Sequence, residues 1–210
     1  MYPFYIYSKM PLTNYHIILT AFWVLYGFIH SLMASLWFKK KIEKLTGKYY
    51  KWYRLFYSCF AALLLLLLIV FQYSHKSILL FSTPFIIKAL SVIALIAGVF
   101  VMAISIKRYF FLLSGVAVFT NEEDKKHVPL QQGINAHMRH PLYSGTLLVL
   151  WSLFFLFPFL NNLIACSVIT VYTLIGIKLE EHKLILEFGE LYRSYQQKVP
   201  MLIPSLHLFR

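Results

Sequence analysis

The sequence predicts an all-α, polytopic membrane protein with about five transmembrane helices and a C-terminal amphipathic helix. Three observations carry this prediction. Hydrophobic residues make up 60% of the chain and the mean hydropathy is +0.67, which is more apolar surface than one soluble core of this size can bury. Apolar runs of about 20 residues recur along the chain. The positive charge is grouped between those runs.

Five apolar runs approach the length that a helix needs to cross a bilayer. At 1.5 Å per residue, a hydrocarbon core roughly 30 Å thick requires about 20 residues. Asn161-Asn162 separates the last two runs, and Pro158 lies just before it, which predicts a tight helical hairpin at the bilayer surface. The runs cover residues 15–38, 53–73, 85–106, 141–160 and 163–179.

The distribution of Lys and Arg predicts the orientation of these spans. The loop 39–54 holds seven Lys or Arg against one Glu, which places it in the cytoplasm. Alternation then puts the N-terminus and the loop 74–84 outside, and puts 107–140 and the tail after 181 in the cytoplasm. The chain is therefore expected in the cytoplasmic (inner) membrane of a cell, as a single domain over 1–210 that faces the lipid bilayer. Because the positive charge has this topological explanation, nucleic acid is not expected as a partner.

Two polar clusters stand beside apolar runs and are candidates for chemistry. The segment HMRHPLY (137–143) precedes the fourth run, and Pro141 suits the first turn of a helix, so His140 lies at the helix entrance. Glu180 and Glu181 follow the fifth run, near the inner interface. The alternative is that the two acids only mark the water boundary. His30 in the first run is a further candidate, although a hydrogen-bonded structural His is an equally good interpretation.

Several motifs of soluble enzymes are absent from the sequence. It contains no G-x-G, so neither a Rossmann fingerprint nor a P-loop is available for a nucleotide. The histidines show no HExxH or other paired spacing, and no metal site is expected.

The two polar clusters and their spacing resemble a known superfamily of membrane enzymes. The pattern is G133-x5-RHP-x-Y-x-G145, then EE (180–181), L184, FG (188–189), Y192, Y195, VP (199–200) and IP (203–204). It resembles the isoprenylcysteine carboxyl methyltransferase and phospholipid methyltransferase superfamily over residues 107–204. The N-terminal half, with YGFIHSLMAS (26–35) and YKWYRLFYS (50–58), resembles bacterial NnrU-like proteins and methanethiol S-methyltransferases.

The resemblance implies an integral membrane methyltransferase that uses S-adenosylmethionine. In this interpretation residues 1–106 form three N-terminal spans, and 107–210 hold a cofactor-binding loop, the helical hairpin and the C-terminal helix. Hydrogen-bonding acids and an aromatic face are suitable for the ribose and the sulfonium of that cofactor. The implied cofactor contacts are His127, Val128, Pro129, Leu130, Asn135, His140, Pro141, Leu142, Tyr143 and Glu180.

The resemblance also bears on the acceptor of the methyl group. The isoprenylcysteine enzymes carry an Arg one turn before the cofactor Glu, where this sequence has Gly176. Loss of that carboxylate clamp leaves room for a thiol or another small lipophilic nucleophile. Direct in-line displacement would be oriented by Arg139, Glu181 and Tyr192, and His30 or His140 would remove a thiol proton.

Two other functions remain open at this point. One is a non-enzymatic NnrU-like membrane protein that assists the assembly of a redox cofactor. The other is a membrane reductase of the sterol-reductase type. The sequence does not choose among a thiol, a prenylcysteine and a phospholipid amine as acceptor, and it leaves the oligomeric state open.

Overall fold

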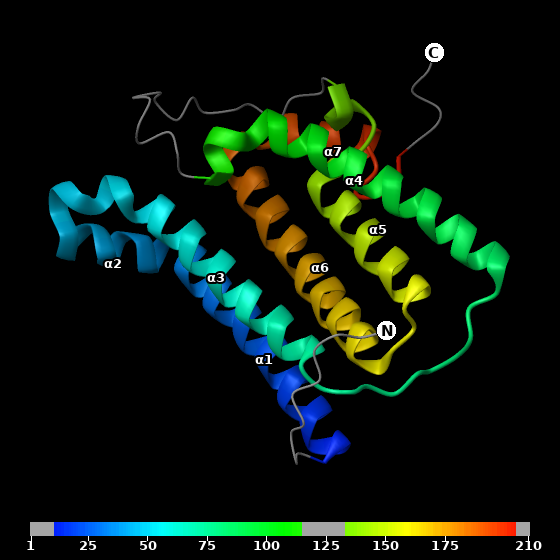
Figure 1. Ribbon diagram of the computed structural model, residues 1–210. Coiled ribbons are helices and arrows are strands. Elements are labelled where there is room, and N and C mark those ends of the chain that lie inside the picture. The colour runs from blue at the N-terminus through cyan, green and yellow to red at the C-terminus, as the bar shows by residue number, and fades with distance from the viewer. Residues whose placement is uncertain (1–10, 115–132, 205–210) are drawn as a thin grey trace. The chain divides into compact units, whose positions relative to one another are not determined.

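The computed structural model describes residues 11–114 and 133–204, which fold almost entirely as helices (Figure 1). Within these ranges there is no β-sheet, and an isolated bridge pairs Leu79 with Phe159. The α-helices are α1 (Leu12–Ala34), α2 (Leu36–Thr46), α3 (Tyr53–Tyr73), α4 (Phe85–Ser114), α5 (Pro141–Leu156), α6 (Leu160–Phe188) and α7 (Glu190–Lys198). The 3-10 helices within the described residues are η1 (Gly47–Trp52) and η3 (Gly133–Ala136).

The helices confirm an all-α membrane protein. Four helical segments of the described chain are long and apolar enough to cross a membrane, namely Leu12–Ala34, Leu36–Tyr73, Phe85–Lys107 and Leu160–Phe188. The shorter α5 is also apolar, which gives four to five candidate spans. Large apolar side chains such as Phe28, Leu66 and Ile93 are exposed on these helices. Such surfaces would be unfavourable in water and suit contact with lipid.

The chain forms two compact units. The first contains α1, α2, η1 and α3, with the following loop and the beginning of α6 up to Ile169. The second contains most of α4, η3, α5, the remainder of α6 and α7.

The core of the first unit combines apolar packing with a buried polar network. Tyr15, Leu19, Trp23, Leu68 and Ala165 form its apolar cluster. Beside it, the indole of Trp23 donates to Gln72 Oε1 at 2.9 Å, and Gln72 Nε2 donates to Asn162 Oδ1 at 3.0 Å. Unpaired amides would be very unfavourable in an apolar setting. Within the described chain, no buried side-chain nitrogen or oxygen lacks a partner.

Two helix boundaries in the first unit differ from the expected spans. The apolar run 15–38 is interrupted at Ser35, which is extended and whose hydroxyl accepts from the N–H of Phe38 at 3.2 Å, so that α2 begins as a separate helix. The turn of the expected hairpin lies at 157–159 rather than at Asn161-Asn162. Pro158 lacks the N–H needed to continue α5, and both asparagines lie in the first turn of α6.

The C-terminal helices also divide differently from the expectation. α6 continues past Glu180 and Glu181 to Phe188, because no helix-breaking residue lies between Glu181 and Phe188. The predicted amphipathic helix is then split by Gly189, whose φ of 54° is readily adopted by glycine. α7 packs back on the end of α6, and the cluster consists of Tyr192, Tyr195 and Val199 with Leu184, Ile185 and Phe188.

In the second unit, α4 and α5 approach each other closely at two glycines. A Cβ built on Gly98 would lie 2.9 Å from Val149 Cγ2 and 3.0 Å from the carbonyl oxygen of Gly145. A Cβ on Gly145 would lie 2.8 Å from Met102 Cγ and 2.9 Å from the carbonyl oxygen of Gly98. Because backbone atoms form part of each contact, rotation of a side chain cannot relieve the crowding.

We therefore expect Gly98→Ala to destabilise the protein by about 1–3 kcal/mol through overpacking. Gly176→Ala is the matched control on α6, since a Cβ there meets nothing within 4 Å and Ala favours a helix by about 1 kcal/mol. Thermal unfolding in detergent should lower the midpoint for the first variant and leave it unchanged or raise it for the second. Equal midpoints for the Gly98→Ala and Gly176→Ala variants would contradict the close approach of α4 and α5.

Candidate active site

The carboxylate of Glu181 is the centre of the polar cluster in the second unit. Its Oε1 accepts from Arg139 Nε at 2.6 Å and lies 3.0 Å from Nε2 of His140. Its Oε2 accepts from Gln196 Nε2 at 2.9 Å. The side chain of Glu181 is 12% exposed, so this charge depends on its protein donors for solvation. Three segments therefore meet at one carboxylate: the Arg-His-Pro turn, the acid pair on α6, and α7.

Arg139 ties the C-terminal segment to this centre. Its Nη1 donates to the carbonyl oxygens of Gln196, at 2.9 Å, and Val199. The main chain adds two bonds, from the N–H of Arg139 to Pro200 and from the N–H of His140 to Met201. The planar fork of a guanidinium suits such simultaneous contacts with a carboxylate and carbonyls.

The beginning of α5 is held on both sides. His140 is its N-cap residue and Pro141 occupies the first turn, as expected. The hydroxyl of Ser144 donates to the carbonyl of Leu202 at 2.6 Å, which adds a side-chain bond to the C-terminal segment. In η3, which precedes α5 in sequence, the backbone carbonyl of buried Asn135 accepts a hydrogen bond from the Tyr195 hydroxyl at 2.6 Å.

Glu180 has different surroundings from its neighbour. Its side chain is 47% exposed, and its Oε2 accepts from the Tyr143 hydroxyl at 3.1 Å. The same oxygen lies 4.0 Å from Nδ1 of His140. The rings of His140 and Tyr143 stack with centroids 5.7 Å apart. A solvent-accessible carboxylate beside an aromatic surface is able to receive a cationic or hydroxyl-bearing ligand.

Tyr192 lies beside the Glu181 carboxylate and is almost fully buried. Its hydroxyl is 3.5 Å from Glu181 Oε1, a long contact. Burial, reinforced by the negative charge of Glu181, raises the pKa of the Tyr192 hydroxyl well above its ordinary value. The hydroxyl therefore remains protonated at neutral pH and acts as a donor rather than as a base.

The structure brings together most of the residues singled out from the sequence. Arg139, Glu181 and Tyr192 meet directly, while Glu180 adjoins His140 and Tyr143. The sequence interpretation missed Gln196, although it lies one helical turn after Tyr192. The remaining predicted contacts of this unit, Asn135, Pro141 and Leu142, lie in η3 and the first turn of α5.

Five other sequence-predicted residues are not part of this cluster as described. The loop residues His127, Val128, Pro129 and Leu130 lie outside the described residues. His30 belongs to the first unit, where the Tyr57 hydroxyl lies 2.9 Å from its Nε2.

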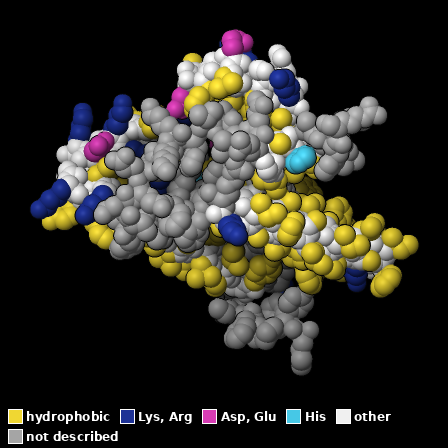
Figure 2. Space-filling view, turned by 90° about the horizontal axis from the view of Figure 1, so that it is seen from above, with side chains coloured by type: hydrophobic (Ala, Val, Ile, Leu, Met, Phe, Trp, Pro, Cys, Tyr) yellow, Lys and Arg dark blue, Asp and Glu magenta, His cyan; other side chains and the backbone are white. Residues whose placement is uncertain are grey.

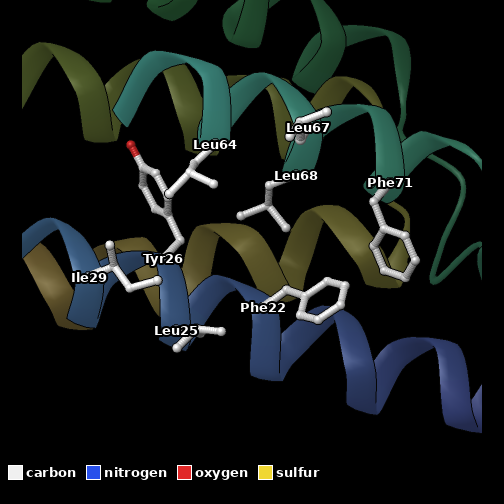
Figure 3. A pocket seen from close by; sticks show the side chains of 8 residues that line it. All are labelled: Phe22, Leu25, Tyr26, Ile29, Leu64, Leu67, Leu68 and Phe71. Atoms are coloured by element: carbon white, nitrogen blue, oxygen red, sulfur yellow. The ribbon is translucent and has the colours of Figure 1, made fainter. Parts of the chain in front are cut away.

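A cavity in the first unit lies between α1 and α3 (Figure 3). Its lining is apolar except for the Tyr26 hydroxyl, which makes it suitable for hydrocarbon and unsuitable for a charged cofactor. Across residues 11–114 and 133–204, no group of three or more metal-ligating side chains is present. The lining residues are Phe22, Leu25, Tyr26 and Ile29 of α1 and Leu64, Leu67, Leu68 and Phe71 of α3.

The family model described as NnrU protein matches residues 18–203. The chain belongs to the NnrU protein family. This family match spans both halves of the chain, including the Arg-His-Pro turn and the acid pair.

Proteins to which this chain is similar include named methyltransferases. The chain is 32% identical to a methanethiol S-methyltransferase of Crocosphaera subtropica over 185 residues, which cover 84% of this chain and 70% of the relative. A methanethiol S-methyltransferase of Pseudomonas deceptionensis is 44% identical over 71 residues, 33% of this chain and 26% of the relative. A protein-S-isoprenylcysteine O-methyltransferase of Schizosaccharomyces pombe is 32% identical over 92 residues, 42% and 38% of the two chains.

These relatives and the apolar helices support a membrane methyltransferase. They also bear out the resemblance of the sequence to both groups of enzymes. No solved structure matches the chain.

The contacts of Arg139 predict that its removal loosens the C-terminal segment. Arg139→Ala leaves Glu181 without its closest donor, and we expect a loss of roughly 3 kcal/mol, as for other buried ion pairs. Hydrogen–deuterium exchange should rise in residues 196–202. Arg193→Ala is the control, because its pair with Glu190 is exposed on both sides and is worth about 0–1 kcal/mol. Unchanged exchange in Arg139→Ala would show that the segment is held by other contacts.

Proposed function

We propose that this chain is an integral membrane methyltransferase that uses S-adenosylmethionine to methylate a small thiol or another lipid-soluble nucleophile. The supporting observation is the meeting of the Arg-His-Pro turn with Glu180 and Glu181 at one partly exposed cluster. The names of the relatives support methyl transfer as the reaction. Together they favour an enzyme over a non-enzymatic membrane protein.

The residues of the cluster fit the chemical groups of S-adenosylmethionine. Glu180 would accept hydrogen bonds from ribose hydroxyls or from the ammonium group. The face of Tyr143, beside His140, tolerates a sulfonium cation. Pro141 and Leu142 at the entrance of α5 and Asn135 of η3 would complete the described part of the proposed site. The loop residues 127–130 are proposed to contribute the remaining contacts, on the strength of the family resemblance.

The reaction follows from the properties of these side chains. When bound, S-adenosylmethionine supplies a methyl group on a sulfonium, whose carbon–sulfur bond breaks as the acceptor sulfur forms its own bond to that carbon. The protein's contribution is to orient donor and acceptor and to exclude water. His140 is proposed to take the thiol proton, and the carboxylate of Glu181 would stabilise the imidazolium that forms. Arg139, Gln196 and Tyr192 orient Glu181. His30 in the first unit is the other candidate base.

Two observations favour a thiol as the acceptor. The relative that covers 84% of this chain is named a methanethiol S-methyltransferase. Position 176, where the isoprenylcysteine enzymes have an Arg, is Gly, and the space around it is open to at least 4 Å from a Cβ. No guanidinium is therefore present there to hold a substrate carboxylate.

We further propose that the chain lies in the inner membrane with its site on the cytoplasmic side. The helices are long and apolar enough to cross a bilayer, and the excess of Lys and Arg in 39–54 favours the cytoplasm for that loop. Alternation of spans then places the Arg-His-Pro turn on the same side.

The two acids should differ when each is converted to its amide. Glu180→Gln is expected to weaken binding of labelled S-adenosylmethionine at least about tenfold, the effect of losing one charge-assisted hydrogen bond, with the thermal midpoint unchanged. Glu181→Gln should lower both the cofactor affinity and the thermal midpoint, because the three donors to Glu181 hold the fold. Both are measured on the full chain in detergent by equilibrium binding and thermal unfolding.

Glu187→Gln is the matched control, since Glu187 is an exposed acid on the same helix. It should change neither quantity. Wild-type affinity in Glu180→Gln would remove Glu180 from the proposed site. Absence of cofactor binding by the wild-type chain would favour the non-enzymatic alternative.

The acceptor can be identified by parallel assays with labelled S-adenosylmethionine. Methanethiol, a prenylated cysteine and phosphatidylethanolamine represent the three acceptor classes. We expect transfer to the thiol at a kcat/KM at least about a hundredfold above the others, equivalent to at least about 2.7 kcal/mol of discrimination. Preferential methylation of the prenylcysteine or the lipid amine would overturn the thiol assignment while leaving methyl transfer intact.

A further inference from the structure

A face of α2 carries lysines and large apolar side chains together. Positions 37, 40, 41, 44 and 45 recur at the spacing of one side of a helix. Trp37, Lys40, Lys41, Lys44 and Leu45 occupy them, and all five are exposed. We call these five residues the basic face. The single acid of this helix, at position 43, falls outside that spacing.

A neighbouring side of α2 packs on the protein. Phe38 and Ile42 are half-buried, and the ring of Phe38 lies 6.5 Å from that of Tyr53. The helix is therefore fixed with the basic face outward. Its exposed apolar residues are large, with Trp37 65% and Leu45 73% accessible.

η1 extends the same chemistry. Lys48 and Lys51 are exposed, and each lies over an aromatic ring, at 5.3 Å from the centroid of Tyr49 and 5.7 Å from that of Trp52. Within α2, Lys41 lies 5.5 Å from the ring of Trp37. Figure 2 shows Lys and Arg side chains gathered near apolar ones at the left of the view, where α2 and η1 lie in Figure 1.

The connections of α2 and η1 hold the basic face at a membrane surface. α1 ends at Ala34 and α3 begins at Tyr53, and both belong to segments that can cross a bilayer. The Tyr53 hydroxyl donates to the carbonyl of Met33 at 2.6 Å, which joins the two helix ends. Together, α2 and η1 connect these ends, so they cannot move far from the lipid headgroups.

We propose that the basic face binds anionic phospholipid headgroups, with its lysines at the phosphates and with Trp37 and Leu45 at the acyl boundary. Lysines beside exposed aromatic and aliphatic side chains are the chemistry of interfacial helices, which bind anionic lipid by charge and by apolar burial together. A nucleic acid would satisfy the lysines and leave Leu45 in water. The proposal concerns the first unit and does not depend on methyl transfer.

The test titrates the full chain, in a non-ionic detergent, with phosphatidylglycerol or phosphatidylcholine. Binding is followed by tryptophan fluorescence, because exposed Trp37 and Trp52 would enter a less polar environment. We expect phosphatidylglycerol to bind at least about tenfold more tightly than phosphatidylcholine, with a difference that shrinks at high salt.

Substitution of the lysines separates this surface from general positive charge. The triple variant Lys40→Gln/Lys41→Gln/Lys44→Gln should lose roughly a hundredfold in affinity for phosphatidylglycerol, at about fivefold per lysine. Lys76→Gln/Lys88→Gln/Lys107→Gln removes the same charge elsewhere and should lose little. An unchanged thermal midpoint establishes that the first variant is folded.

Three results would overturn the proposal. They are equal affinity for the two lipids, equal losses in the two triple variants, and binding of a short RNA or of inorganic phosphate as tight as that of phosphatidylglycerol at the same salt. The last result would define a general polyanion surface.

Discussion

The buried carboxylate of Glu181 is the interaction on which the second unit depends. A charge nine-tenths removed from solvent is stable only when protein donors replace water. Here those donors come from two other segments of the chain, the Arg-His-Pro turn and α7. The C-terminal segment is consequently part of the site rather than an appendage. Arg139 and His140 both bond to Glu181, and Arg139 also donates to Gln196 and Val199, so the site and the C-terminal segment are coupled.

Two adjacent acids acquire different roles because a helix turns about 100° per residue. Glu181 faces α7 and the Arg-His-Pro turn, whereas Glu180 is half-exposed and touches Tyr143. A carboxylate with three close protein partners is poorly suited to bind a ligand, while one that reaches solvent exchanges water for ligand at little loss. The pair thus combines a structural acid with a candidate binding acid, and His140 lies near both of them.

The sequence predicted the helices better than their ends. Its run 53–73 coincides with α3 because the basic, aromatic segment before it and Ser74 after it mark both boundaries. The breaks at Ser35 and Gly189 were missed, although a capping serine and a glycine are known stop signals, since the apolar pattern continues across both. The meeting of the Arg-His-Pro turn with the acids was foreseen through family resemblance. The bond from Gln196 to Glu181 was not, because periodicity identifies a face of a helix and not its partner.

α6 shows how one helix serves a structural and a chemical purpose. Near its beginning, Asn161 and Asn162 bond to Gln72 of α3 and stabilise the first unit. Toward its other end, Glu180 and Glu181 build the candidate site. The largely apolar stretch 163–179 between these pairs is about 26 Å long, close to the thickness of a hydrocarbon core. The amides of Asn161 and Asn162 and the carboxylates of Glu180 and Glu181 therefore lie at the ends of that stretch, where water and other segments of the chain are able to pair with them.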